Sequence, residues 1–205
     1  MADADSALRA KLMIFAYGSL VNPAARPKEL GAIEASLSGW SREWGHRIST
    51  PHGNVCALTV VQDTAACIRG VVLAGNDAEH FEIDEREIGY ERIPVTVRKI
   101  GGNGESLLSC SLYVGTKADH GAATREYPIW RSYLDCILGG YLMLGGLKAV
   151  EDFVKSTRGW PAPILDDRDS PMYPRAVCLT SREKDLIDSV LRRYLLLSDI
   201  HAQQN

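Results

Sequence analysis

The sequence predicts an α+β fold, with a barrel or strongly curled mixed sheet in its first part and helices in its second. Up to about residue 115, short β-branched or aromatic segments are separated by Gly, Asn, Asp or Pro, a pattern typical of strands. After residue 120, apolar side chains recur at helical spacings. We therefore expect a barrel core over residues 11–120 and a helical extension over residues 121–205, packed in the same domain.

Six segments have the character of strands. The first is a short buried strand over Leu12–Phe15 that runs into Tyr17-Gly18-Ser19, and Pro23 follows closely. Such a Gly-Ser step is usually a turn, but it can also be a place where bare backbone N–H groups face a ligand. In full, the expected strand segments are residues 13–20, 41–49, 55–63, 67–75, 93–101 and 107–116.

Helices are expected between and after these strands. The acidic segment 76–92 favours a short helix that ends at Gly89. Between residues 126 and 160 the apolar spacing predicts two helices, interrupted at Gly139-Gly140 and Gly145-Gly146. The Pro- and Asp-rich segment 161–180 should be irregular. After it, Ser181 is the expected N-cap of a final amphipathic helix.

Composition excludes several functional classes. The net charge of −3 over 205 residues provides no basic field for nucleic acid, and no apolar run approaches the roughly 20 residues of a membrane span. The acidic, polar N-terminus does not resemble a signal peptide, so we expect a cytoplasmic protein. The five cysteines are scattered, and the five histidines lack metal-ligand spacing. We therefore expect no disulfide framework, no metal and no cofactor.

The carboxylates at positions 82, 84, 85 and 87 have two interpretations. They are either one solvated face of an acidic helix, or they include a group that transfers protons. Phe81, Ile83 and Ile88 alternate with them, so the segment cannot expose every charge. Glu87 precedes Gly89, where the helix should meet a strand, and a partly desolvated carboxylate there would have a raised pKa suited to proton transfer.

Taken in order, several motifs resemble those of the γ-glutamylcyclotransferase-like superfamily, and the bacterial ChaC-like branch is the most similar. The resemblance covers roughly residues 11–120. Its motifs are FAYGSL (15–20), GWSR (39–42), CALTVV (56–61), CIRGVV (67–72), IDEREIGY (83–90) and LYVGT (112–116).

This resemblance implies a small mixed β-barrel of the γ-glutamylcyclotransferase-like type, with flanking helices. It also implies that Tyr17, Gly18, Ser19 and Leu20 form the loop that holds a γ-glutamyl group, and that Glu87 is the catalytic acid/base. The implied reaction is cyclising cleavage of a γ-glutamyl amide to 5-oxoproline and a free amine. The partner would be a small molecule, and the leaving group stays open between glutathione, a γ-glutamyl amino acid and a γ-glutamyl amine.

Two further candidates have alternative roles. Arg175, in the segment 166–175, is either part of a surface loop tied by ion pairs or, like Arg168, a rim residue that meets a substrate carboxylate. Tyr113 is either a core aromatic or a hydroxyl donor near the site. Two other functional classes also stay open, namely a non-catalytic module that binds γ-glutamyl groups and a cysteine-dependent hydrolase.

Overall fold

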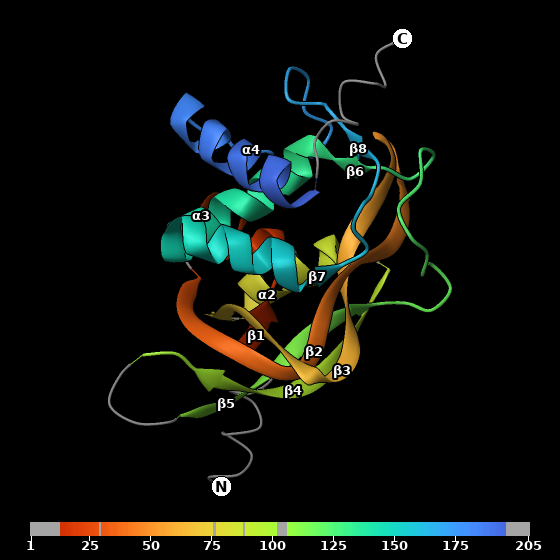
Figure 1. Ribbon diagram of the computed structural model, residues 1–205. Coiled ribbons are helices and arrows are strands. Elements are labelled where there is room, and N and C mark those ends of the chain that lie inside the picture. The colour runs from red at the N-terminus through yellow and green to blue at the C-terminus, as the bar shows by residue number, and fades with distance from the viewer. Residues whose placement is uncertain (1–12, 29, 76, 88, 102–105, 196–205) are drawn as a thin grey trace, which may run out of the picture.

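A closed β-barrel forms the centre of the computed structural model, which describes residues 13–28, 30–75, 77–87, 89–101 and 106–195 (Figure 1). Five strands close it in the order β3-β1-β5-β4-β2, because β2 pairs again with β3. The pairing of β1 with β5 is parallel and the other barrel pairings are antiparallel, which confirms the predicted mixed barrel and the α+β class. The strands are β1 (Met13–Ala16), β2 (Gly31–Thr50), β3 (Gly53–Ala74), β4 (Tyr90–Lys99) and β5 (Leu107–Gly115).

The long hairpin of β2 and β3 differs from the shorter strands expected. Segments 55–63 and 67–75 belong to one strand, and β2 begins at Gly31 rather than near residue 41. The register jumps between the Ser38–Cys67 and Trp40–Gln62 pairs, and residues 63–66 have no partner there. Gly39, with φ of 84°, occupies this irregularity. The expected gap in β3 is therefore a bulge inside a continuous strand.

The first strand and the acidic helix lie close to their expected positions. β1 ends at Ala16, two short 3-10 turns follow at Ser19–Val21 and Pro23–Ala25, and Leu12 lies outside the described residues. α2 (Asp77–Arg86) ends just before Glu87, and Gly89 has φ of 91° where the chain turns into β4. The expected stop at Gly89 is thus close to the observed helix end.

Helix α3 (Arg131–Ser156) corrects one of the two expected helix breaks. The backbone is non-helical at Gly145 and Gly146, but the helix runs unbroken through Gly139 and Gly140. A Cβ at Gly140 would lie 2.7 Å from the backbone nitrogen of Asn22, so this glycine allows the helix to pack directly against the loop after β1. The pair at 139–140 serves close packing rather than chain reversal.

The C-terminal part is irregular from residue 159 to 180, as expected, except for short strands. β6 (Ile129–Trp130) pairs with β8 (Ile164–Leu165), and β7 (Thr157–Arg158) pairs with β2. α4 (Ser181–Leu195) packs on the side of α3 away from the barrel (Figure 1). The N-cap is Thr180 rather than Ser181, because Thr180 and Glu183 exchange hydrogen bonds in a capping box.

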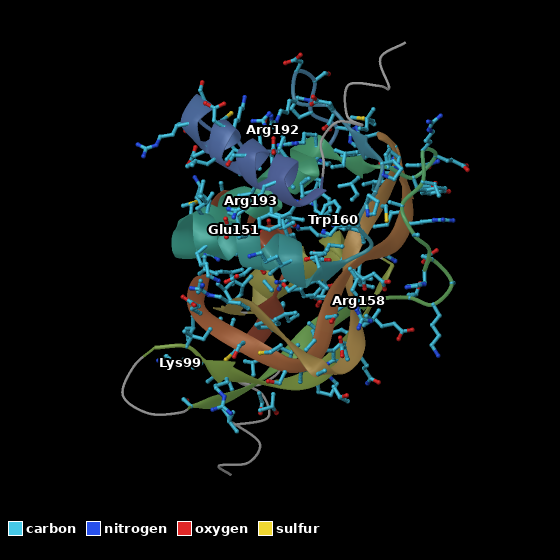
Figure 2. All side chains as sticks on the ribbon, in the orientation of Figure 1. Lys99, Glu151, Arg158, Trp160, Arg192 and Arg193 are labelled. Carbon is cyan, nitrogen blue, oxygen red and sulfur yellow. The ribbon has the colours of Figure 1, made fainter. Side chains whose placement is uncertain are left out.

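The side of α3 that faces α4 carries charged contacts across the helix pair. Arg193 of α4 lies over Glu151 of α3 (Figure 2), with 3.5 Å between Nη1 and Oε1. By length and composition α3 could cross a membrane, yet 61% of its most apolar window is buried within the protein. Burial of this kind is found in core helices of folded domains, so the apolar stretch is explained by packing between barrel and α4.

Candidate active site

Two adjoining cavities open beside the C-terminal end of β1. The larger has a volume of about 450 Å³. Ser19, Glu87, Tyr90 and Tyr133 line both, so these four residues mark the boundary between them. The smaller cavity is also lined by the first strand and loop, together with Leu58 and Tyr113, and the larger also by Arg86, Tyr173 and Arg175. The structure therefore brings all the predicted site residues to one place.

The loop that follows β1 is held rigidly from two sides. The Tyr17 hydroxyl donates to the Tyr113 carbonyl oxygen at 2.7 Å, and the Tyr17 carbonyl accepts from the Tyr141 hydroxyl at 2.9 Å. In the 3-10 turn, the N–H groups of Val21 and Asn22 donate to Gly18 and Ser19. Ser19 and Leu20, whose N–H groups precede the first of these bonds, line the smaller cavity.

Glu87 lies directly after helix α2. Its N–H donates to the Ile83 carbonyl and its carbonyl accepts from the Tyr90 N–H, so the backbone is fixed on both sides. Within the described part of the chain, no group donates a hydrogen bond to its carboxylate. Burial raises the pKa of Glu87, the guanidinium groups of Arg86 and Arg175 act in the opposite direction, and Asp84 adds to the rise. A carboxyl with a raised pKa beside a cavity is suited to transferring protons.

Arg86, which the sequence did not single out, projects toward the larger cavity. Its Nη1 donates to the Ala25 carbonyl at 2.7 Å, whereas Nε and Nη2 are buried without a well-oriented partner among the described residues. Burial lowers the pKa of Arg86, and nearby Arg175 lowers it further. We call Arg86, Glu87, Tyr173 and Arg175 the cavity cluster. The only sequence signal for Arg86 was its position directly before Glu87.

Arg175 and Tyr173 approach from the irregular segment before α4. Arg175 Nε lies 3.4 Å from the Tyr173 hydroxyl, and its guanidinium lies over the Tyr173 ring at 5.2 Å. The same hydroxyl lies close to the side chains of Ser19 and Arg86. Both residues line the larger cavity, so segment 166–175 forms part of its rim and not only a surface loop.

That segment is fastened to the start of α3. The Asp167 carboxylate accepts from the Ser132 N–H at 2.7 Å, from the Ser132 hydroxyl at 2.5 Å and from the Met172 N–H at 2.8 Å. The Ser132 hydroxyl in turn accepts from the Tyr173 N–H at 3.2 Å. Asp167 and Ser132 therefore set the position of Tyr173, and through it that of Arg175.

Arg168 does not line either cavity and belongs to a second charged group, which we call the anchor cluster. Arg168 Nε lies 2.6 Å from Asp135, and its Nη2 lies 2.7 Å from Asp188. Arg131 Nε lies 2.9 Å from Asp135, and Arg131 also pairs with Asp188. Arg168 thus ties the segment to α3 and α4, so of the two arginines considered for the rim only Arg175 reaches the cavity.

Tyr113 is a core aromatic whose hydroxyl also forms a hydrogen bond near the site. It is buried in the barrel wall at 6% exposure and lines the smaller cavity, as a core aromatic would. Its hydroxyl hydrogen-bonds to Asp84, while its backbone carbonyl receives the Tyr17 hydroxyl. Burial, with the Asp84 contact, raises the pKa of Tyr113 far above its ordinary value. Tyr113 therefore fixes Tyr17 and α2 at the edge of the site.

Comparison with known proteins identifies the fold. No family model and no curated protein sequence matches the chain. Among solved structures, one named γ-glutamyl cyclotransferase aligns at a TM-score of 0.58 and 20% identity, covering 87% of this chain and 98% of its own. An uncharacterized protein from Homo sapiens aligns at 0.58 and 19%, covering 86% and 98%. The chain has the γ-glutamylcyclotransferase fold.

Within this fold, two tyrosines not singled out as site residues complete the boundary between the cavities. The Tyr90 hydroxyl donates to the Leu58 carbonyl at 2.9 Å, and the Leu58 N–H donates to the Tyr133 hydroxyl at 3.4 Å. Tyr133 was visible in the sequence only as one apolar position on a helix, whereas Tyr90 belongs to the IDEREIGY motif. Both tyrosines line the two cavities together with Ser19 and Glu87.

The cysteines give no support to a thiol nucleophile. None of the five lines either cavity. Burial raises the pKa of Cys56 to about 11 and the pKa values of Cys110 and Cys136 to about 12, so these thiols stay protonated and weakly nucleophilic. In the described ranges of the γ-glutamylcyclotransferase fold, no group of three or more His, Cys, Asp or Glu side chains is placed to hold a metal ion.

Proposed function

We propose that this protein is a γ-glutamylcyclotransferase-type enzyme that cleaves a γ-glutamyl amide to 5-oxoproline and a free amine. The observation that carries the proposal is the Glu87 carboxylate at the junction of two cavities, with no hydrogen-bond donor from the described residues. Burial raises its pKa, and the loop 17–20 lies on the same cavity wall. One carboxylate in such a setting can accept a proton and return it at neutral pH.

The chemistry requires little beyond positioning and proton transfer. The substrate's own α-amine attacks the γ-carbonyl carbon, the new C–N bond closes a five-membered ring, and the original amide C–N bond breaks. Because the nucleophile is tethered to the electrophile, much of the entropic cost of bringing them together is absent. In our proposal Glu87 takes a proton from the α-amine and then delivers it to the departing amine.

The two cavities suggest how the substrate lies. We place the γ-glutamyl group in the smaller cavity, with its α-carboxylate at the N–H groups of Ser19 and Leu20. The scissile amide then lies beside Glu87, and the leaving group occupies the larger cavity. In this placement Tyr90 and Tyr133, which line both cavities, flank the scissile amide.

The test is 5-oxoproline release from glutathione, γ-glutamyl amino acids and γ-glutamyl amines by wild type and Glu87→Gln. We expect the substitution to lower turnover by about 10²–10⁴-fold, since it removes the proton-transferring group but keeps its shape. Glu82→Gln is the matched control, because Glu82 is an exposed carboxylate of the same helix that lines neither cavity. Turnover that survives Glu87→Gln would refute the role of Glu87, and no wild-type turnover would favour a binding module.

A further inference from the structure

Arg42 of β2, the last residue of the GWSR motif, is a buried charge without a counter-ion. It is 2% exposed and forms no ion pair with a carboxylate of the described residues. Its guanidinium lies over the Phe153 ring at 4.7 Å. Within the described ranges its N–H groups donate only to neutral oxygens, namely the Arg69 carbonyl and the hydroxyls of Tyr141, Ser156 and Thr157. Burying an unpaired charge is costly, so packing alone gives no reason for an arginine here.

The Arg42 charge is connected to the loop after β1 by one side chain, that of Tyr141 on α3. Arg42 Nη1 lies 3.3 Å from the Tyr141 hydroxyl oxygen. This hydroxyl lies 2.9 Å from the Tyr17 carbonyl oxygen and 2.7 Å from the Arg69 carbonyl oxygen. The Arg69 carbonyl also accepts from Arg42 Nη1 at 3.0 Å. That carbonyl is therefore satisfied without Tyr141, and the single hydroxyl proton can serve Tyr17.

This chain of hydrogen bonds acts on the first peptide unit of the loop. Hydrogen bonds in series polarise one another, and they are stronger when one member is charged. A donor at the Tyr17 carbonyl fixes the peptide unit that joins Tyr17 to Gly18 and leaves its N–H end more positive. Burial raises the pKa of Tyr17 far above its ordinary value, and the Arg42 charge acts in the opposite direction. The charge is therefore felt at the loop.

We propose that Arg42 is a positioning residue for substrate binding, and that its charge, acting through Tyr141, favours a carboxylate at the loop 17–20. The four loop residues line the smaller cavity, whereas Arg42 and Tyr141 line neither cavity and do not touch a ligand there. This inference rests on the proposed function, which places the α-carboxylate of the substrate at the loop. Arg42 acts on affinity and not on proton transfer, so its loss should raise KM and leave kcat nearly unchanged.

The experiment compares 5-oxoproline with 2-pyrrolidinone, two ligands that differ only in the carboxylate. The proposed reaction releases 5-oxoproline whatever the leaving group is, so this pair requires no knowledge of the rest of the substrate. Affinities are measured by ligand-detected NMR titration. We expect the wild type to bind 5-oxoproline at least about tenfold more tightly than 2-pyrrolidinone, because hydrogen bonds to a charged group are stronger than neutral ones.

Tyr141→Phe removes the connecting hydroxyl and keeps the ring. We expect its affinity for 5-oxoproline to fall by about 3–10-fold, the effect of one hydrogen bond, and its affinity for 2-pyrrolidinone to stay within about twofold. In turnover assays KM should rise and kcat should stay within about twofold of wild type. Tyr194→Phe is the matched control, because Tyr194 of α4 packs beside Lys155 and lines neither cavity.

Two substitutions of Arg42 separate its charge from its shape, with folding checked by circular dichroism. Arg42→Met should lower the affinity for 5-oxoproline by about 10–100-fold, whereas Arg42→Lys, which keeps the charge, should lower it by about 2–5-fold. Arg158→Met is the control for loss of an arginine, since Arg158 pairs with Asp63 and lines neither cavity (Figure 2). Tyr141→Phe keeps the inference testable if Arg42→Met fails to fold.

The outcomes separate this inference from the proposed function. Equal changes for both ligands in Tyr141→Phe, or no change in either, would overturn the role of Arg42 even if the wild type releases 5-oxoproline and Glu87→Gln does not. Equal losses in Arg42→Lys and Arg42→Met would overturn the role of its charge. A loss confined to 5-oxoproline would support the inference even if the wild type turns over none of the γ-glutamyl substrates. Failure of the folded wild type to bind either ligand would count against both.

Discussion

The anchor cluster and the cavity cluster each hold two arginines, but their charges are treated in opposite ways. In the anchor cluster, Arg131 and Arg168 share the carboxylates of Asp135 and Asp188, and several contacts measure between 2.6 and 2.9 Å. In the cavity cluster, Arg86 and Arg175 make no ion pair with Glu87, although Glu87 and the exposed Glu85 line the same cavity. The segment 166–175 contributes to both groups, with Arg168 in the anchor cluster and Tyr173 and Arg175 in the cavity cluster.

In these two clusters, arginines that stabilise the fold can therefore be distinguished from arginines that are available to a ligand by whether they form ion pairs. Two arginines matched by two aspartates make a neutral group whose desolvation is offset by short hydrogen bonds, and its purpose is to hold elements in place. In the cavity cluster, no ion pair between Arg86 or Arg175 and Glu87 offsets the burial of these charged groups. Such an imbalance costs stability unless a ligand completes it, which makes the cavity cluster a candidate for function.

The largest effect is expected when one carboxylate of the anchor cluster is removed. Asp135→Ala leaves Arg131, which is 3% exposed, with one carboxylate fewer. We expect the free energy of unfolding to fall by about 3–5 kcal/mol, because a buried charge loses its partner. Chemical denaturation measures this loss. Asp152→Ala, which breaks an exposed pair with Lys148, is the control and should cost about 0.5 kcal/mol or less.

A cost below about 1 kcal/mol for Asp135→Ala would mean that the matched charges do not stabilise the fold, since removal of a buried partner normally costs several times more. Unpaired arginines would then be no reason to assign a function to the cavity cluster, because the fold would tolerate unpaired charge in both clusters.

The second test concerns the link between the two clusters. Asp167→Asn replaces a carboxylate that accepts three hydrogen bonds by an amide with one acceptor oxygen. We expect a loss of about 1–3 kcal/mol in the free energy of unfolding and a raised KM, because Tyr173 and Arg175 lose their fixed position. Hydrogen exchange over residues 168–175 measures the loosening. Glu126→Gln, at an exposed carboxylate outside this segment, should leave exchange in residues 168–175 unchanged.

The third prediction, with the smallest effect, concerns how Glu87 of the cavity cluster makes the free energy of unfolding depend on pH. Burial raises the pKa of Glu87, so its unfolded form gives up its proton more readily than its folded form. Below the unfolded pKa near 4.5, Glu87 is protonated in both states and does not lower the free energy of unfolding. As pH rises from there through the folded pKa, the wild type loses stability. Glu87→Gln should therefore gain stability relative to wild type over that interval and keep the gain above it.

The measurement is thermal or chemical unfolding of both proteins from pH 4 to pH 8. A constant difference across that range would show that the pKa of Glu87 is the same in the folded and unfolded states. A gain that grows toward low pH would show that the pKa is lowered rather than raised, with the carboxylate already neutralised by the arginines.

The barrel was predictable from sequence because its signals are local. Alternating β-branched residues bounded by Gly, Asn or Pro marked β5 to within one residue and β4 to within three, and the acidic segment marked α2. Gly139 and Gly140 were misread as a helix break, because their reason lies in Asn22, a residue distant along the chain. The pattern of neighbouring residues does not show that a glycine is needed for close packing against a residue far away in the sequence.

The residues of the candidate site also differ in whether a local sequence pattern predicts them. Glu87 and the loop 17–20 were predicted through ordered motifs, and Arg175 through a charged segment between prolines. The structure places all of them at the two cavities. Arg86 was missed because an arginine in an acidic helix suggests a surface ion pair, and its burial depends on the Ala25 carbonyl. Asp167 was visible as one of several aspartates, and only the position of Ser132 shows which of them is structural.

The cavity has walls from both ends of the chain: the loop after β1, the turn after α2 and the segment before α4. Only a fragment that runs from Ser19 to Arg175 contains them all, so the barrel strands can form before any complete cavity exists. Contacts between distant parts of a chain form late, after loop closure has been overcome. Ligand binding to this cavity would therefore report completed docking of the C-terminal half, and during refolding it would lag behind the appearance of the sheet.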